Sequence, residues 1–296
     1  MRTDWKGVFP ALTTHFKADQ SIDFSAAAAH MERLLRAGVH GLIMLGSIGE
    51  NCALDADEKR QVLTHAVDTV KGRVPIIAGT AECTTSLACR YAADAQKMGV
   101  NGLMVLPAMV YKSDPRETLT HFRAVARTTD LPIMAYNNPV SYGVDITPEM
   151  FVDLASEANI VAIKESSDDV RRITDIINAT GDRYALFAGV DDLILESLML
   201  GCVGWVGGLV NAFPEESVRL YELVVAGQHK EALELYRWFM PLLHLDVSHK
   251  VVQCLKLAQN MTGLGSEVVR APRLMLDGAE REHVRTIVQH ALDQRP

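Results

Sequence analysis

Short apolar runs recur along the chain at nearly regular intervals up to residue 208. Each run is largely free of charge and is bounded by Gly, Pro or Asp, which is typical of strands buried on both faces. The eight runs cover residues 7–16, 41–47, 74–80, 102–107, 131–137, 160–166, 185–191 and 201–208. The pattern therefore predicts eight strands of a parallel sheet.

The segments between these runs have the spacing of amphipathic helices. Segment 25–38 ends at Gly38, a residue typical of a helix C-terminus, and segment 55–72 begins with Asp55 or Asp57 as a candidate N-cap. Alternation of strands and helices predicts a parallel sheet with crossover helices. Eight such units in a chain of this size favour an α/β protein with a (β/α)8 TIM barrel over an open sheet.

The strand pattern stops near residue 225, and the rest of the chain is helical in character. Segments 226–246 and 250–262 are amphipathic. We therefore expect a catalytic barrel in residues 1–225 and a C-terminal helical domain in residues 226–296. No low-complexity linker separates the two parts, so we expect them to pack as one body.

Composition and charge narrow the function classes. The chain has 296 residues, and Lys plus Arg (29) against Asp plus Glu (37) gives a net charge of −8, which argues against a general nucleic-acid surface. The N-terminus lacks a signal-peptide pattern, and no run of 18 apolar residues predicts a membrane span. The five cysteines form no CxxC pair, which favours free thiols and a cytoplasmic location.

The sixth apolar run, IVAIKES, carries the most prominent candidate. Active sites of these barrels lie at the C-terminal ends of the strands, where Lys164 is placed. Neighbours on a strand alternate, so Lys164 and Glu165 cannot both point inward. A lysine inside the barrel would have a lowered pKa and a free amine to attack a carbonyl carbon. The alternative is a lysine that reaches solvent or pairs with Glu165.

Two more strand ends offer polar groups. The turn GSIGEN, residues 46–51, could bind an anion such as a carboxylate through the N–H groups near Ser47 and Ile48, although most such turns are only turns. Tyr136 in AYNNP could transfer protons, although a core tyrosine is the commoner case. Among ten histidines only His15 lies near a strand end, and no HxH or HExxH spacing occurs, so no metal site is predicted.

The motifs GSIGE, YNNP, IKES and FAGVDD occur in this order with barrel spacing. The chain thereby resembles, over nearly its whole length, the lysine Schiff-base family that includes dihydrodipicolinate synthase and N-acetylneuraminate lyase. The resemblance implies a (β/α)8 barrel with a helical C-terminal domain and no metal or organic cofactor. It also implies a small keto or imino acid substrate and a homotetramer built as a dimer of dimers.

The resemblance also assigns roles to residues. It implies Lys164 as the Schiff-base lysine and Tyr136 as the catalytic tyrosine, with the hydroxyl of Ser47 in the proton relay. The carboxylate-binding turn falls on Ser47 and Ile48. Main-chain carbonyl groups that face the substrate fall on Gly189 and Val206.

Several positions depart from the synthase pattern. The synthase motif GTTGE has two threonines, and here Ile48 replaces the second of them. The arginine that holds the second substrate's carboxylate is replaced by Ser141, which Tyr142 follows. The family's tyrosine that crosses the dimer interface falls near Met109, which makes Tyr111 a candidate replacement. These departures argue against dihydrodipicolinate synthase activity.

The combination of GSIGEN, NNPVSYG and WFMPLLHLD is most similar to the branch that deaminates 1-pyrroline-4-hydroxy-2-carboxylate in hydroxyproline degradation. That reaction yields 2-oxoglutarate semialdehyde and ammonia, and Ser141 and Tyr142 would then lie at the substrate. One alternative is another lyase of the family, such as a 2-keto-3-deoxy sugar acid aldolase or dehydratase, N-acetylneuraminate lyase or dihydrodipicolinate synthase. The other is a non-catalytic barrel that binds a small acid.

Overall fold

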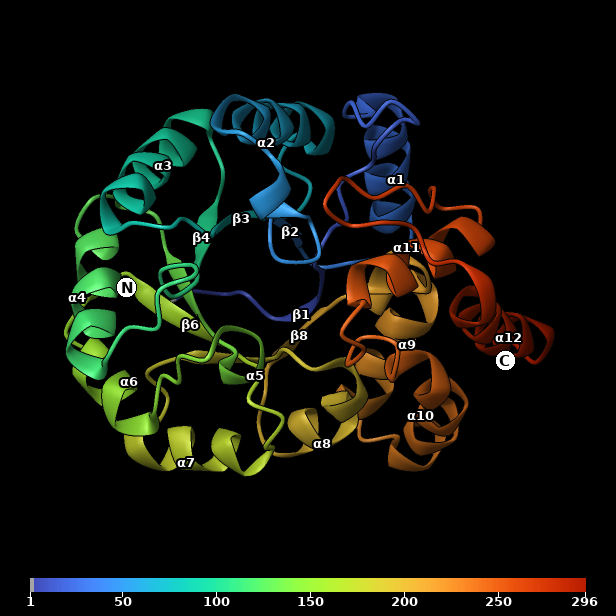
Figure 1. The fold of residues 1–296 in the computed structure, drawn as a ribbon. Helices are drawn as coiled ribbons and strands as arrows, with labels where there is room; N and C mark the ends of the chain where they lie inside the picture. The colour runs from blue at the N-terminus through green and yellow to red at the C-terminus, as the bar shows by residue number, and fades with distance from the viewer. Residues whose placement is uncertain (1–2) are drawn as a thin grey trace.

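The computed structural model describes residues 3–296, and it confirms the predicted barrel (Figure 1). The parallel strands pair in the order β1-β8-β7-β6-β5-β4-β3-β2, and a parallel bridge between Ala11 and Ile43 closes the circle. Each strand lies inside one of the eight apolar runs. The strands are β1 Gly7–Pro10, β2 Leu42–Met44, β3 Ile76–Thr80, β4 Gly102–Val105, β5 Ile133–Asn137, β6 Ile160–Glu165, β7 Ala185–Ala188 and β8 Gly204–Gly207.

Helices follow the strands and form a ring around the barrel (Figure 1). Asp55 caps α2 as predicted, because its side chain accepts hydrogen bonds from the N–H groups of Asp57 and Glu58. The ring helices are α1 Phe24–Arg36, α2 Ala56–Val70, α3 Thr85–Met98, α4 Pro115–Ala126, α6 Pro148–Leu154, α7 Arg171–Thr180, α8 Ile194–Met199 and α9 Pro214–Val225. Short helices lie in the loops at α5 Pro139–Tyr142, η1 Asn51–Ala53, η2 Asp191–Leu193 and η3 Leu209–Asn211.

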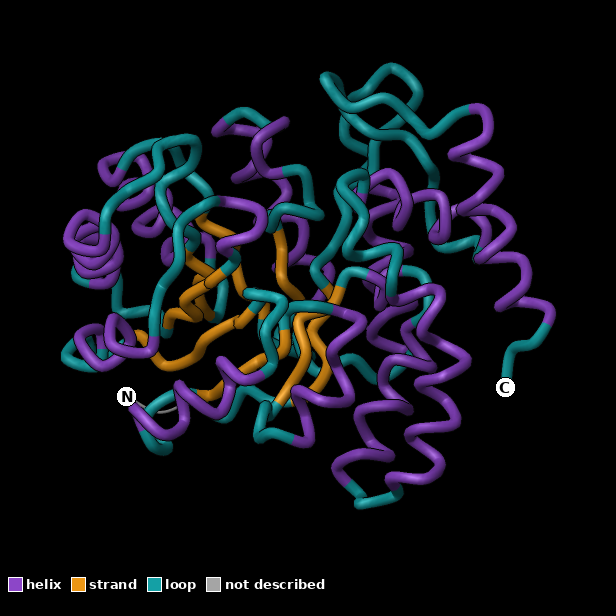
Figure 2. Tube along the Cα trace, turned by 60° about the horizontal axis from the view of Figure 1, so that its bottom comes forward, coloured by secondary structure: helices purple, strands orange, loops and turns teal. Residues whose placement is uncertain are grey.

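The C-terminal region is helical, as predicted, and consists of α10 His229–Leu243, α11 Val251–Met261 and α12 Gly278–Asp293. These helices gather beside one side of the barrel (Figure 2). Phe213, just before α9, packs edge-on against Phe239 of α10 with ring centroids 6.0 Å apart. The barrel and the C-terminal region therefore share one hydrophobic core, and a domain boundary at residue 225 stays a prediction. Among the described residues, no helix is both long and apolar enough to cross a membrane.

A buried ion pair fixes the C-terminal region to the turn after β2. Lys256 Nζ of α11 donates to Glu50 Oε1 at 2.6 Å, and the backbone N–H of Arg270 donates to Glu50 Oε2 at 3.0 Å. Glu50 is fully buried and has a φ of 53°. Burial lowers the pKa of Lys256, and the adjacent Glu50 carboxylate opposes that shift. The turn after β2 and helix α11, which are far apart in the sequence, are thus held together by a buried ion pair.

We expect Lys256→Met to lower the free energy of unfolding by about 3 kcal/mol, because the buried Glu50 carboxylate then keeps only the more distant Arg273, 3.8 Å away, as an ion-pair partner. Urea denaturation of the two proteins measures the difference. The double variant Glu50→Gln with Lys256→Met removes both charges and should recover part of the loss. A loss below about 1 kcal/mol for Lys256→Met, the range of an exposed pair, would contradict the structural role of this pair.

Candidate active site

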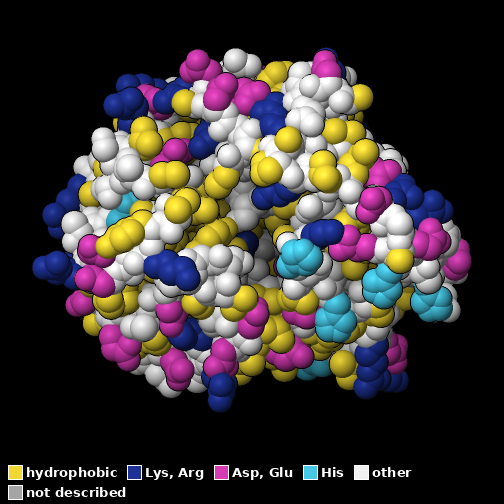
Figure 3. Space-filling model, in the orientation of Figure 1, with side chains coloured by type: hydrophobic (Ala, Val, Ile, Leu, Met, Phe, Trp, Pro, Cys, Tyr) yellow, Lys and Arg dark blue, Asp and Glu magenta, His cyan; other side chains and the backbone are white. Residues whose placement is uncertain are grey.

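A cavity of about 440 Å³ opens at the C-terminal ends of the strands, where the barrel rule places it. The space-filling view shows this face of the molecule hollowed at its centre (Figure 3). Most of the residues singled out in the sequence meet there. Those that line the cavity are Ser47, Ile48, Tyr136, Ser141, Lys164, Gly189 and Val206.

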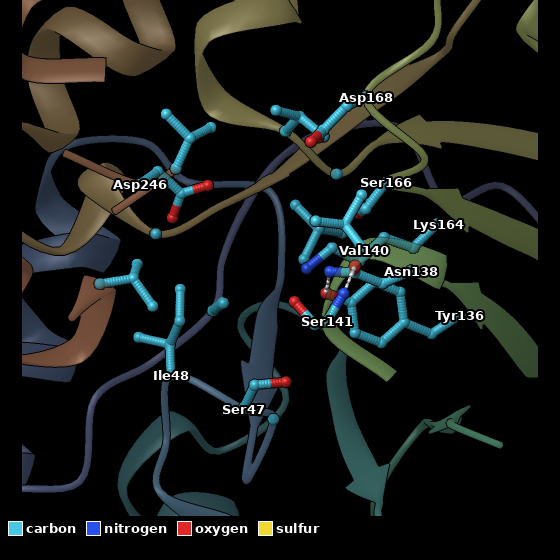
Figure 4. Close-up of a pocket in the computed structure, with 18 of the residues that line it drawn as sticks. Ser47, Ile48, Tyr136, Asn138, Val140, Ser141, Lys164, Ser166, Asp168 and Asp246 are labelled. Atoms are coloured by element: carbon cyan, nitrogen blue, oxygen red, sulfur yellow. Dashed lines mark hydrogen bonds between the residues drawn. The ribbon is translucent and has the colours of Figure 1, made fainter. Parts of the chain in front are cut away.

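Lys164, near the end of β6, points into this cavity (Figure 4). Its side chain is only 5% exposed, and Nζ lies 4.3 Å from the centroid of the Tyr136 ring. Burial lowers the pKa of Lys164 to about 8, against the opposing effect of the nearby carboxylates of Asp246 and Asp191. A substantial share of free amine is therefore present near neutral pH. Glu165 points elsewhere, as strand alternation predicts, and accepts a hydrogen bond from Asn137 at 3.1 Å.

Gly189, just after β7, makes room for this lysine. A Cβ atom at position 189 would lie 2.0 Å from Ser166 Oγ and 2.8 Å from Lys164 Cε. Any other residue would displace Lys164, so glycine at this position is a steric requirement of the site. The predicted role of the Gly189 carbonyl in facing the substrate stays a prediction.

Tyr136 lies beside Lys164 because the β5–β6 register pairs the two residues. Its hydroxyl accepts a hydrogen bond from Asn138 Nδ2 at 3.0 Å. Burial raises the pKa of Tyr136 to about 12, although the neighbouring Asn138, Ser166 and Ser47 side chains oppose the rise. The phenol is therefore neutral at pH 7 and can act by passing a proton.

Tyr142 of α5 differs from the other predicted residues because it does not line the cavity. Its hydroxyl instead forms a short hydrogen bond with Ser47 Oγ, and its ring packs edge-on against Tyr136 with centroids 5.9 Å apart. Burial raises the pKa of Tyr142 above its ordinary range. Ser47 is thus hydrogen-bonded to Tyr142, whose ring contacts Tyr136, so three hydroxyl-bearing side chains of the same chain lie near one another, which suits a proton relay.

The GSIGEN turn offers two backbone N–H groups at the cavity. Within the described chain, no hydrogen bond engages the N–H groups of Ser47 and Ile48, which leaves both donors available. Asn51 holds the turn from behind by donating to Leu45 O at 2.8 Å, and Thr14 Oγ1 donates to Gly49 O at 2.6 Å. The turn can therefore present two fixed donors to a substrate carboxylate.

Three carboxyl groups lie in or next to the cavity; the strand-end rule includes Asp191 among the candidates but neither Asp168 nor Asp246. Asp191 is fully buried and accepts hydrogen bonds from Trp205 Nε1 at 2.9 Å and from Leu209 N at 2.7 Å; burial raises its pKa to about 6. Asp168 lines the cavity with a left-handed φ of 62°. Asp246 reaches the cavity from the C-terminal region, between α10 and α11.

Asp246 was missed because sequence reasoning placed the site only at strand ends. The available signal was HLDVSH, a polar break with a carboxylate between two apolar helices. Tyr111 lies outside this cavity, where its hydroxyl donates to Glu117 at 3.1 Å, so its predicted contact with a neighbouring subunit stays a prediction. In the part of the chain that the structure describes, no group of three or more His, Cys, Asp or Glu side chains is arranged to hold a metal ion.

Comparison with known proteins agrees with this geometry. A model of the dihydrodipicolinate synthetase family matches residues 4–291. The chain belongs to this family of lyases. The 4-hydroxy-tetrahydrodipicolinate synthase of Methanospirillum hungatei is 32% identical over 90% of this chain and 93% of its own, and that of Methanoculleus marisnigri is 33% identical over 96% and 98%.

Solved structures of the family superpose closely. A dihydrodipicolinate synthase from Bacillus anthracis has a TM-score of 0.93 and 30% identity, with 98% of this chain and 99% of the other covered. A prophage protein of the dihydrodipicolinic acid synthase family from E. coli K12, in complex with pyruvate, has a TM-score of 0.93 and 29% identity with the same coverage. These relatives are named for the synthase or its family, and none of these names supports the hydroxyproline branch.

We expect borohydride to trap pyruvate on the peptide that carries Lys164, at a rate that rises with pH through a midpoint of about 8. The reason is that only the free amine attacks the carbonyl carbon, and burial lowers the pKa of Lys164 to about 8. Peptide mass spectrometry after timed trapping measures the rate, with Lys164→Arg as the unlabelled control. Labelling of Lys112 or Lys250 instead would contradict this assignment.

Proposed function

We propose that this family member is a Schiff-base lyase for small 2-keto or 2-imino acids that deaminates 1-pyrroline-4-hydroxy-2-carboxylate to 2-oxoglutarate semialdehyde and ammonia. The observation that supports this choice is the charge of the cavity. Among its described lining residues Lys164 is the sole lysine or arginine, and Asp168 and Asp246 face the same space. Such a cavity suits a substrate with one carboxylate and a neutral or cationic remainder.

The absence of a guanidinium argues against a second carboxylate. Arginine binds carboxylates through paired hydrogen bonds that few other groups can replace. Ser141 lines the cavity where the synthase pattern has its arginine, and the buried Ile48 lines it where the pattern has a hydroxyl. Aspartate semialdehyde and its condensation product with pyruvate would bring a second carboxylate into a cavity whose described lining offers no guanidinium to bind it.

The proposed reaction begins at the imine carbon, C2. The substrate carboxylate binds the N–H groups of Ser47 and Ile48, and the amine of Lys164 adds to C2. The C2–N bond of the ring then breaks, which leaves an imine on Lys164 and a primary amine on C5. As that bond breaks, Tyr136, relayed through Ser47, gives its proton to the departing ring nitrogen, and the resulting phenolate then removes a proton from C3 and gives an enamine.

The remaining steps consume water. The C4 hydroxyl leaves as water, and a proton shift from C5 moves the double bond to the carbon that bears the amine. Hydrolysis there yields the aldehyde and ammonia, and hydrolysis of the imine at C2 releases Lys164. Every carbon–nitrogen bond that breaks is thus replaced by a carbon–oxygen bond.

A second candidate is the synthase reaction itself, because both archaeal relatives carry that name. The pyruvate complex of the prophage protein likewise favours a keto acid in the shared site. Other family alternatives are cleavage or dehydration of a 2-keto-3-deoxy sugar acid and cleavage of N-acetylneuraminate. A barrel that only binds a small acid would form no imine with any of these compounds.

We expect ammonia from the hydroxypyrroline carboxylate and little condensation of pyruvate with aspartate semialdehyde. The physical reason is that the described lining of the cavity has no lysine or arginine besides Lys164 to bind a second carboxylate. Parallel coupled assays with one enzyme preparation measure both reactions, and pyruvate release from sugar acids serves as a third arm. Efficient condensation without ammonia would reverse the choice between the two candidates and leave Lys164 as the nucleophile.

We also propose that the protein assembles as a homotetramer and that the loop before α4 contributes to a subunit contact. Val110 in this loop has a φ of 75° and is 93% exposed, and Tyr111 is 60% exposed. A left-handed β-branched residue that faces solvent is costly unless something packs on it. Sedimentation velocity should give the mass of four chains; a monomer at micromolar concentration would refute the proposal.

A further inference from the structure

The C-terminal region delivers one carboxyl group to the active-site cavity. Asp246 lies between α10 and α11, and it lines the cavity together with Lys164 and Tyr136 of the barrel. Its carboxyl group faces the open space from the side opposite Lys164 and Tyr136 (Figure 4). A substrate bound to Lys164 would therefore lie between Tyr136 and Asp246.

The position of Asp246 is fixed by contacts on both sides of it. His244 Nδ1 and Asp192 Oδ2 are 2.8 Å apart, which ties the segment to the turn after β7, and the N–H of Asp246 donates to Leu243 O at 3.0 Å. A Cβ atom at Gly208 would lie 2.5 Å from Asp246 Oδ1. Only glycine at position 208 leaves room for the carboxyl group, so the site is built around it.

The surroundings of Asp246 favour its protonated form. Burial raises the pKa of Asp246 well above its usual range, and the negative charges of Asp191 and Asp192 add to the rise, against the opposing effect of Lys164. A carboxylic acid that keeps its proton near neutral pH is a proton donor. The proposed reaction needs such a donor, because a hydroxide is a poor leaving group and the neutral Tyr136 is already engaged at C3.

We propose that Asp246 is the general acid that protonates the departing C4 hydroxyl. In the enamine on Lys164, the nitrogen lone pair forms the C2–N double bond, and the C2–C3 pair becomes the C3–C4 double bond. The C4–O bond breaks as the proton of Asp246 joins the oxygen, which gives water and the Asp246 carboxylate. The carboxylate then accepts the proton that leaves C5 in the following tautomerisation, which restores the acid.

This inference rests on the proposed function and deepens it by naming the substrate class. A general acid at this place serves acids whose hydroxyl group is on the carbon two bonds from the imine carbon, so that the enamine can expel it. The 4-hydroxyl of the pyrroline carboxylate meets that condition, and so does the 4-hydroxyl of a 2-keto-3-deoxy sugar acid.

The test compares Asp246→Asn with Tyr136→Phe in deuterated water. Asn fills the same space and cannot donate the proton, so Asp246→Asn should lower ammonia release about 10²–10⁴-fold. It should still exchange C3 hydrogens for deuterium, and borohydride should trap an adduct that retains the hydroxyl. Tyr136→Phe should lower both the exchange and the release. Asp277→Asn, in the C-terminal region outside the cavity, is the matched control and should behave as wild type.

The outcomes separate the two proposals. Near-normal ammonia release by Asp246→Asn would overturn the general-acid role. So would a variant that neither forms an imine with pyruvate nor exchanges the C3 hydrogens. Retained trapping of pyruvate by Asp246→Asn shows that its fold and Lys164 are intact. If wild type releases no ammonia, the deaminase proposal fails, and water loss from a 2-keto-3-deoxy sugar acid then tests Asp246. If wild type removes water from neither the hydroxypyrroline carboxylate nor the sugar acid, both the deaminase proposal and the general-acid proposal fail.

Discussion

Burial of the Lys164 amine at the end of β6 is the constraint on which most of the site depends. Taking an ammonium out of water is costly, and the protein meets that cost partly by lowering the pKa and partly by placing carboxyl groups nearby. The same burial requires glycine at position 189, because a side chain there would occupy the space of Lys164. The lowered pKa of Lys164, the nearby carboxyl groups and the glycine at position 189 therefore all follow from the burial of this one amine.

The turn after β2 lines the same cavity as Lys164, and its shape depends on residues that are distant in the sequence. Glu50 ends this turn in a left-handed conformation and pairs with Lys256 of α11. Because the pair is buried, moving α11 would leave charges unpaired. The C-terminal region thus holds the turn that carries the N–H groups of Ser47 and Ile48, in addition to placing Asp246 in the cavity.

The sequence predicted the barrel well because each strand is an apolar run with its own boundaries. Lys164 and Tyr136 could be found for a related reason, since the barrel rule points to strand ends. Asp246 could not be found this way: it lies in a loop between helices, and the contact with the barrel mouth depends on packing that periodicity does not encode. The pairing of Tyr142 with Ser47 was missed similarly, because side-chain direction in a one-turn helix is set by tertiary contacts. The substrate branch depends on a few side chains, which family likeness alone does not determine.

The short connection between α10 and α11 carries Asp246 yet contributes nothing to the strand pairing of the barrel. Under the proposed mechanism, imine formation at Lys164 and protonation of the leaving group by Asp246 depend on separate stretches of chain. Mutation can alter the connection at little risk to the nucleophile, which offers evolution a way to change one reaction into another. Divergence would then accumulate first in this loop of the C-terminal region, well away from Lys164 in the barrel.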